Sequence, residues 1–182
     1  EMVSEAQCQR YERLFGTLRG EGARFSEMTQ PYTPYQYDIM LCEFKRDLEC
    51  YLSHSSAKLK TLDDIIAFYE ADGQTRMKYG ISTLQDAARK SAEDSVYREA
   101  MAERARMRSQ VVSELEGYDA CVMTGPTNIM HFTGLPSLAL NLCMGEDGIP
   151  RGIILYGAEE RRLLAAALTI ETYCAPFCPP EL

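Results

Sequence analysis

The residues of this sequence that could do covalent chemistry are few and lie far apart. Cys121 and His131 could form a thiol–imidazole pair, in which the imidazole takes a proton from the nucleophile. A single cysteine and a single histidine ten residues apart carry little specificity, so we interpret them as a core thiol and a surface imidazole. A self-contained cysteine hydrolase is therefore our third hypothesis.

The carboxylates and serines show no convincing catalytic pattern either. Glu43 and Asp47 stand one helical turn apart, as paired carboxylates would, but Lys45, Arg46 and Glu49 beside them favour an ordinary solvated helix face. The sequence lacks the GxSxG motif of hydrolase nucleophiles and the glycine-rich GxxxxGK and GxGxxG loops that bind nucleotides. Taken alone, the residues therefore indicate no catalytic centre.

Metal and cofactor sites have no clear set of ligands. The chain holds two histidines and seven cysteines, whereas a structural zinc site needs clustered ligands such as a CxxC pair. The closest cysteines, Cys174 and Cys178, are separated by a segment that contains proline. We expect no metal and no cofactor, and we interpret the cysteines as reduced thiols of a cytoplasmic protein.

The charge balance argues against two classes of partner. The chain has 27 Asp and Glu against 19 Lys and Arg, a formal charge of −8, whereas nucleic acids and anionic membranes attract basic surfaces. Arg104, Arg106 and Arg108 resemble a basic stripe, but acidic residues along the same predicted helix neutralise it. No apolar run approaches the ~20 residues of a membrane span. We therefore expect neither a nucleic-acid partner nor a membrane.

The spacing of apolar residues predicts a helical first part. Thr61 and Asp64 have the spacing of a capping box that opens a short helix, which should end at Gly73. Weak alternation indicates a short strand over residues 23–28. Apolar residues at helical spacing predict further helices over residues 4–19, 35–52 and 93–116. A short helical turn is expected over residues 84–88.

After residue 117 the pattern changes to strands. Residues 138–143 alternate, with Leu138, Leu140 and Leu142 on one face, and further strands are expected over residues 119–124 and 153–156, before a last helix. We predict an α/β fold, α+β-like as an isolated piece, with helices packed on a small mixed or antiparallel sheet. We expect one unit over residues 1–182, helical over 1–117 and strand-rich with a terminal helix over 118–182.

The amino-acid sequences of these segments resemble the C-terminal portion of the amidase-signature family. The resemblance covers nearly the whole chain and rests on several short stretches in the right order. They are YERLFGTLRGEGA from residue 11, EFKRDLECYL from residue 43, LKTLDDIIAFYE from residue 59, YDACVMTGPT from residue 118 and DGIPRGIILYGAEERRLLAAALTIE from residue 147.

The resemblance implies a hydrolase of carboxylic amide bonds with a Ser–cis-Ser–Lys triad. In that family the triad lies in the N-terminal half, with the serines in a Gly- and Ser-rich segment and the lysine upstream of it. This sequence has no such segment, and none of its five lysines (45, 58, 60, 78 and 90) stands in the family's lysine context. No catalytic residue is therefore carried over, and we expect this chain alone to be inactive.

The resemblance also implies a place for substrate contacts. In related amidases, the loop that corresponds to residues 127–133 lines the pocket, so Asn128, His131, Phe132 and Thr133 are the candidate substrate-contact residues, against an ordinary surface loop as the alternative. The sequence departs from the family at Asn141, where proline is common, and at Cys143, where glycine is common.

Two hypotheses follow from the resemblance. In the first, the chain is the C-terminal part of an amidase, Glu1 is a cut point, and missing sequence supplies the catalytic half for a small amide substrate. Its severed sheet should then expose an unpaired edge. In the second, the chain is a free-standing, non-catalytic module for binding or oligomerisation, such as a homodimer.

Overall fold

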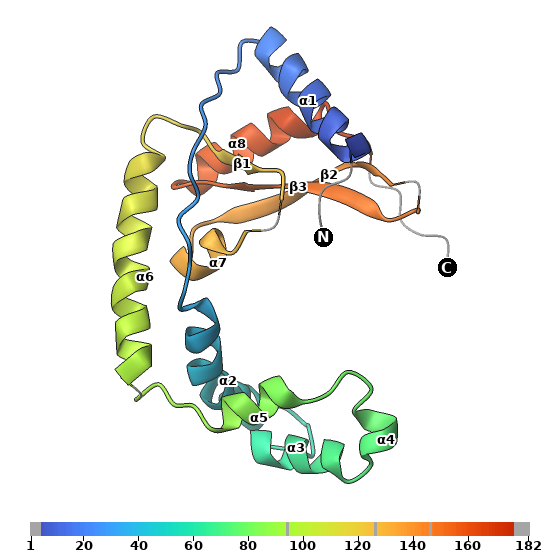
Figure 1. The fold of residues 1–182 in the computed structure, drawn as a ribbon, viewed down its shortest axis with the longest axis vertical. Helices are drawn as coiled ribbons and strands as arrows, with labels where there is room; N and C mark the ends of the chain where they lie inside the picture. Colours follow the sequence, from blue (N-terminus) through green and yellow to red (C-terminus); the bar gives the residue numbers. More distant parts are fainter. Residues whose placement is uncertain (1–4, 94, 126, 146, 177–182) are drawn as a thin grey trace. The chain divides into compact units, whose positions relative to one another are not determined.

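The computed structural model of the 182-residue chain describes residues 5–93, 95–125, 127–145 and 147–176, so Cys178 lies outside the described residues. These residues form two compact units, one of Glu1–Tyr32 with Met107–Leu182 and one of Thr33–Arg106. Eight helices and a small three-stranded antiparallel sheet are found in the described ranges (Figure 1). The predicted class, helices with a small sheet, is confirmed.

The first unit is built on the sheet. Its strands are β1 (Cys121–Met123), β2 (Ser137–Met144) and β3 (Pro150–Tyr156), in the order β1-β3-β2, and both outer strands pair antiparallel with β3. β2 and β3 form a hairpin whose turn is closed by a hydrogen bond from Gly145 N to Ile149 O of 2.9 Å. Gly148 lies in this turn with a φ of 72°, a conformation that favours glycine.

Two helices cover one face of this sheet. They are α1 (Glu5–Gly20) and α8 (Glu160–Glu171), and both lie beside the sheet in Figure 1. The apolar spacing predicted for α1 is confirmed, because Tyr11, Leu14 and Leu18 are buried in one cluster with strand residues and with Leu163 and Ile170 of α8. Burial of such side chains stabilises the unit by roughly 1.5–3 kcal/mol each.

A β-bulge changes the predicted alternation of β2. Leu138, Leu140 and Leu142 pack in the cluster with α1 and α8, as predicted for one face. Strict alternation over residues 138–143 would place Cys143 on the opposite face, but its side chain is buried in the same cluster. The register shifts between Asn141 and Cys143, and this shift turns two successive side chains into the core.

The second unit is helical. It contains α2 (Gln36–Ser53), α3 (Leu62–Glu70), α4 (Gly73–Arg76) and α5 (Ser82–Ala88). Leu41, Leu62 and Ala87 form its buried centre. The prediction that Gly73 ends a helix was wrong, because α3 ends at Glu70 and Gly73 begins α4. The long helix predicted over residues 93–116 is α6 (Ser95–Glu114), which contributes residues to both units.

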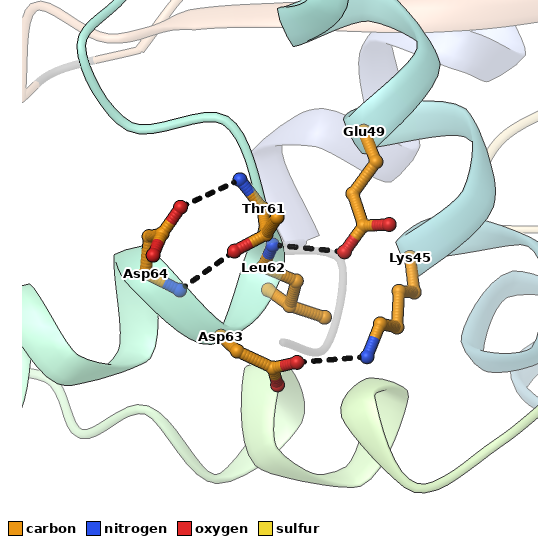
Figure 2. A network of polar contacts seen from close by, with 6 residues as sticks. All are labelled: Lys45, Glu49, Thr61, Leu62, Asp63 and Asp64. Carbon is orange, nitrogen blue, oxygen red and sulfur yellow. Dashed lines mark hydrogen bonds and ion pairs between the residues drawn. The ribbon is translucent and has the colours of Figure 1, made fainter.

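The predicted capping box opens α3. Thr61 Oγ1 accepts a hydrogen bond of 3.0 Å from Asp64 N, and Asp64 Oδ2 accepts one of 3.1 Å from Thr61 N. α2 adds two contacts to the same helix start: Glu49 Oε1 accepts from Leu62 N at 3.2 Å, and Lys45 pairs with Asp63 at 2.9 Å (Figure 2). The three hydrogen bonds satisfy backbone amides at the start of the helix, where the first turn leaves such groups without partners. The Lys45–Asp63 contact is an ion pair between side chains.

Two further local predictions differ from the structure. Residues 23–28 are not a strand, because they make no ladder with the sheet. The predicted loop over residues 127–133 contains a short helix, α7 (Ile129–Thr133), which ends at Gly134 in a left-handed conformation. Within the described residues, none of the helices combines the length and the apolar character that crossing a membrane requires.

Candidate functional site

The first unit contains a groove of about 1000 Å³, which is a candidate binding site. It lies between residues 24–30, which leave the end of α1, and the segment 118–124 that contains β1. We call it the β1 groove. Aromatic, basic and sulfur-containing side chains line it, among them Phe15, Arg19, Arg24, Phe25, Met28, Cys121 and Met123.

Side chains rather than backbone join the two walls of the β1 groove. Ser26 Oγ donates to the Tyr118 hydroxyl at 2.7 Å. Farther along, the Gln30 amide nitrogen lies 2.7 Å from the Tyr156 hydroxyl, which in turn lies 3.0 Å from the Gln30 amide oxygen. Gln30 Nε2 also lies 3.8 Å from Cys121 Sγ, and the Tyr156 hydroxyl lies 3.8 Å from Met28 Sδ. Residues 24–30 are therefore held beside the sheet by side-chain contacts and not by a strand ladder.

The aromatic end of the β1 groove is built by α1 and the residues after it. The Phe15 and Phe25 rings are tilted against each other with centroids 5.3 Å apart. The Arg19 guanidinium lies over the Phe25 ring at 5.0 Å from its centroid, a cation–π distance. This end of the groove thus offers flat apolar surface beside positive charge.

Cys121 lines this groove and carries a thiol, a group that can act as a nucleophile. Burial raises the pKa of the Cys121 thiol, although its hydrogen bonds with Tyr156 and Gln30 act in the opposite direction. Burial also raises the pKa of the Tyr156 hydroxyl. Because the thiolate is the reactive form of cysteine, a protonated Cys121 is a poor nucleophile.

His131 does not complete a catalytic pair with Cys121 in this structure. His131 lies on α7 with an exposed side chain and does not line the β1 groove. No hydrogen bond joins it to Cys121 in the part of the chain that the structure describes. The described residues also contain no cluster of three or more His, Cys, Asp or Glu side chains that could hold a metal.

The four candidate substrate-contact residues lie together on α7 and its N-cap, with different exposure. Asn128 and His131 are exposed, whereas Phe132 and Thr133 are 2% and 1% exposed. Thr133 Oγ1 donates to Ile129 O at 2.6 Å within the helix. None of the four residues lines the β1 groove. Asn128 and His131 are the two members of the set with exposed side chains.

α7 is positioned by a residue that the sequence indicated only as part of a basic stripe neutralised by acidic residues of the same helix. Arg108 of α6 donates to Thr133 O at 2.7 Å and to Gly134 O at 2.9 Å. These are carbonyls at the C-terminal end of α7, where a positive charge also complements the helix dipole.

Sequence reasoning missed the lining of the β1 groove. Ser26 and Gln30 are ordinary polar residues in a segment with weak alternation, and their partners are 92 and 126 residues away in the chain. Spacing patterns of neighbouring residues do not predict contacts between residues so far apart in the chain. The one available signal was the concentration of aromatic and basic residues around the end of the first helix.

Comparison with known proteins gives structural matches and no sequence matches. No family model matches the sequence, and no curated protein matches it. The fold matches an amidase family protein from Bacillus anthracis str. Ames with a TM-score of 0.82 at 22% sequence identity. The match covers 98% of this chain and 38% of that protein.

Two peptide amidase structures also match most of this chain and a similar fraction of their own length. The native peptide amidase from Stenotrophomonas maltophilia matches with a TM-score of 0.71 at 22% identity, over 90% of this chain and 38% of that one. The peptide amidase PAM in complex with the competitive inhibitor chymostatin matches with a TM-score of 0.73 at 24% identity, over 90% and 39%. The chain thus has the fold of part of these amidases and spans about two fifths of their length.

Proposed function

We propose that this chain is the C-terminal part of an amidase-like hydrolase that cleaves carboxylic amide bonds. Its role there is to shape the substrate pocket, while the Ser–Ser–Lys residues come from sequence that this chain does not contain. The observation that carries the proposal is the structural match over 98% of this chain to 38% of a longer amidase family protein.

The environment of Cys121 supports a role in which this chain supplies no nucleophile. Cys121 carries a thiol whose pKa is raised by burial, and no histidine hydrogen-bonds to it among the described residues. The isolated chain is therefore expected to bind or complete a pocket rather than to break a bond. Acyl transfer needs an activated nucleophile and a base, and these would come from the other part of the enzyme.

Within the proposed pocket, α7 supplies two kinds of residue. Asn128 and His131 have exposed side chains that can hydrogen-bond an amide substrate, whereas Phe132 and Thr133 are buried and keep the helix in place. Arg108 acts through its hydrogen bonds to Thr133 O and Gly134 O, which makes it a positioning residue.

The coding sequence immediately upstream of Glu1 tests the proposal. We expect it to encode a Gly- and Ser-rich segment with a lysine before it, and we expect the longer product to hydrolyse small carboxylic amides. Replacing the serines of that segment with alanine should abolish the activity. A stop codon directly upstream, with no such segment, would contradict the proposal and favour the free-standing binding module.

The pocket residues are tested in the longer product. Asn128→Ala and His131→Ala should raise KM for a small amide several-fold, because each removes a polar contact worth about 1 kcal/mol. Glu171→Ala, a change at an exposed residue of another helix, is the matched control and should leave KM unchanged. If KM is unchanged in both α7 variants, α7 does not contact the substrate and the proposed pocket role of α7 is wrong.

A further inference from the structure

We infer that the β1 groove binds a small aromatic zwitterion, a molecule of the chemical class of the free aromatic amino acids. The inference goes beyond the proposed function, because no residue of α7 lines this groove. Three properties of the lining carry it: its charged residues, its aromatic residues and the contacts that hold its walls in place.

The charged residues of the lining are two of each sign. Arg19 and Arg24 are basic, whereas Glu27 and Glu114 are acidic. None of the four forms an ion pair in the part of the chain that the structure describes, although Glu114 accepts a hydrogen bond of 2.9 Å from Gln110. A ligand with one carboxylate and one ammonium group is complementary to this lining, whereas an ion of a single sign is repelled by half of it.

The aromatic residues give the groove a surface for a ring. Phe25 and Tyr118 are 39% and 45% exposed, and the Phe15 ring lies against Phe25 with centroids 5.3 Å apart. A ligand ring can stack on such side chains or meet them edge to face. The Arg19 guanidinium, 5.0 Å from the Phe25 centroid, places a positive charge beside this surface. A ring that carries a carboxylate on a short chain can use both features at once.

The contacts between the walls keep the lining ordered before a ligand arrives. Ser26 Oγ donates to the Tyr118 hydroxyl at 2.7 Å. Gln30 Nε2 lies 3.8 Å from Cys121 Sγ and 2.7 Å from the Tyr156 hydroxyl. A site that is already ordered loses less conformational entropy on binding than a flexible one. Because these contacts tie residues 24–30 to the sheet, the groove suits a small molecule, and its volume of about 1000 Å³ lies within the range of small-molecule sites.

L-phenylalanine and two analogues test the inference on the chain as it stands. The isotope-labelled chain is titrated by NMR with L-phenylalanine, with 3-phenylpropanoate, which lacks the ammonium group, and with 2-phenylethylamine, which lacks the carboxylate. We expect saturable shifts at residues 24–30 and 118–124 with L-phenylalanine, and a Kd of about 1 mM or lower. Each analogue should bind about tenfold more weakly, because one charge-assisted hydrogen bond is lost.

Two variants assign the charges of the ligand to the lining. Arg19→Gln should weaken L-phenylalanine and 3-phenylpropanoate about tenfold and leave 2-phenylethylamine unchanged, because it removes the partner of the carboxylate. Glu27→Gln should weaken L-phenylalanine and 2-phenylethylamine about tenfold and leave 3-phenylpropanoate unchanged. Arg13→Gln and Glu12→Gln are the matched controls, at exposed residues of α1 outside the groove, and should change no affinity.

Several results would overturn the inference. They are the absence of saturable shifts at the groove, an analogue that binds as tightly as L-phenylalanine, and lining variants that behave like their controls. The upstream coding sequence and the KM values of the α7 variants would be unaffected by any of these results, so this inference and the proposed function can fail separately.

Discussion

The Arg108 guanidinium donates a hydrogen bond of 2.7 Å to the backbone oxygen of Thr133, a residue 25 positions later in the chain. A second bond, of 2.9 Å, reaches Gly134 O. One side chain of α6 thus closes the C-terminal end of α7. A helix of five residues has few internal hydrogen bonds, so contacts of this kind decide whether it forms.

We therefore expect Arg108→Ala to destabilise the first unit. The loss of the two hydrogen bonds should lower the free energy of unfolding by about 1–2 kcal/mol, because both acceptors lose a charged donor. Urea unfolding followed by circular dichroism measures the change. Arg104→Ala, on the same helix, is the control and should change stability by less than about 0.5 kcal/mol. Equal effects of the two variants would contradict the role of Arg108.

The capping box at the start of α3 gives a second prediction. Thr61→Ala removes the acceptor of the Asp64 amide and should cost about 1 kcal/mol of stability, as losses of N-cap side chains do. Thr61→Ser keeps the hydroxyl and should retain most of that stability. Urea unfolding of the two variants checks this, and equal loss in both would show that the hydroxyl is not the stabilising group.

The Asp64 carboxylate makes part of this stability depend on pH. Its hydrogen bonds with the Thr61 side chain and with the Lys60 and Thr61 amides lower its pKa in the folded chain. A lowered pKa stabilises the fold above the unfolded pKa of about 3.9, and this contribution is lost as the pH falls through the folded pKa. Asp64→Asn should therefore lose less stability than the unmodified chain between about pH 6 and about pH 3. Parallel acid titrations of the two proteins compare these losses.

The environment of Cys121 predicts slow alkylation. Burial raises the pKa of this thiol, so less of the reactive thiolate is present at neutral pH. Iodoacetamide should modify Cys121 about tenfold more slowly than the exposed Cys50. Peptide mass spectrometry at timed intervals measures both rates, and the difference should vanish in urea. Faster reaction at Cys121 than at Cys50 would revive the cysteine-hydrolase hypothesis.

The sequence predicted those elements whose causes are local. The apolar spacing of residues 4–19 and 35–52 corresponds to α1 and α2, and the Thr61–Asp64 spacing corresponds to a capping box in the structure. Each of these depends on residues within a few positions of one another, where side-chain spacing and backbone hydrogen bonding determine the element.

The features that the sequence did not predict depend on distant residues. α7 is closed by Arg108, 25 residues before Thr133, and residues 24–30 are held by Tyr118 and Tyr156. The β1 groove is built from these contacts, so no window of the sequence contains its pattern. The candidate contacts on α7 came from resemblance rather than from spacing, and they remain a prediction that the α7 variants test.

The bulge between Asn141 and Cys143 has a consequence for how this hairpin can vary in length. Leu142 and Cys143 are neighbours in the chain, and both are buried in the same cluster. A protein with the same hairpin but one residue fewer here would have a regular strand, with every later side chain of β2 on the face that strict alternation requires. A single-residue gap in an alignment at this point would thus mark a change in strand geometry, and grafting the shorter hairpin would require new core residues after position 141.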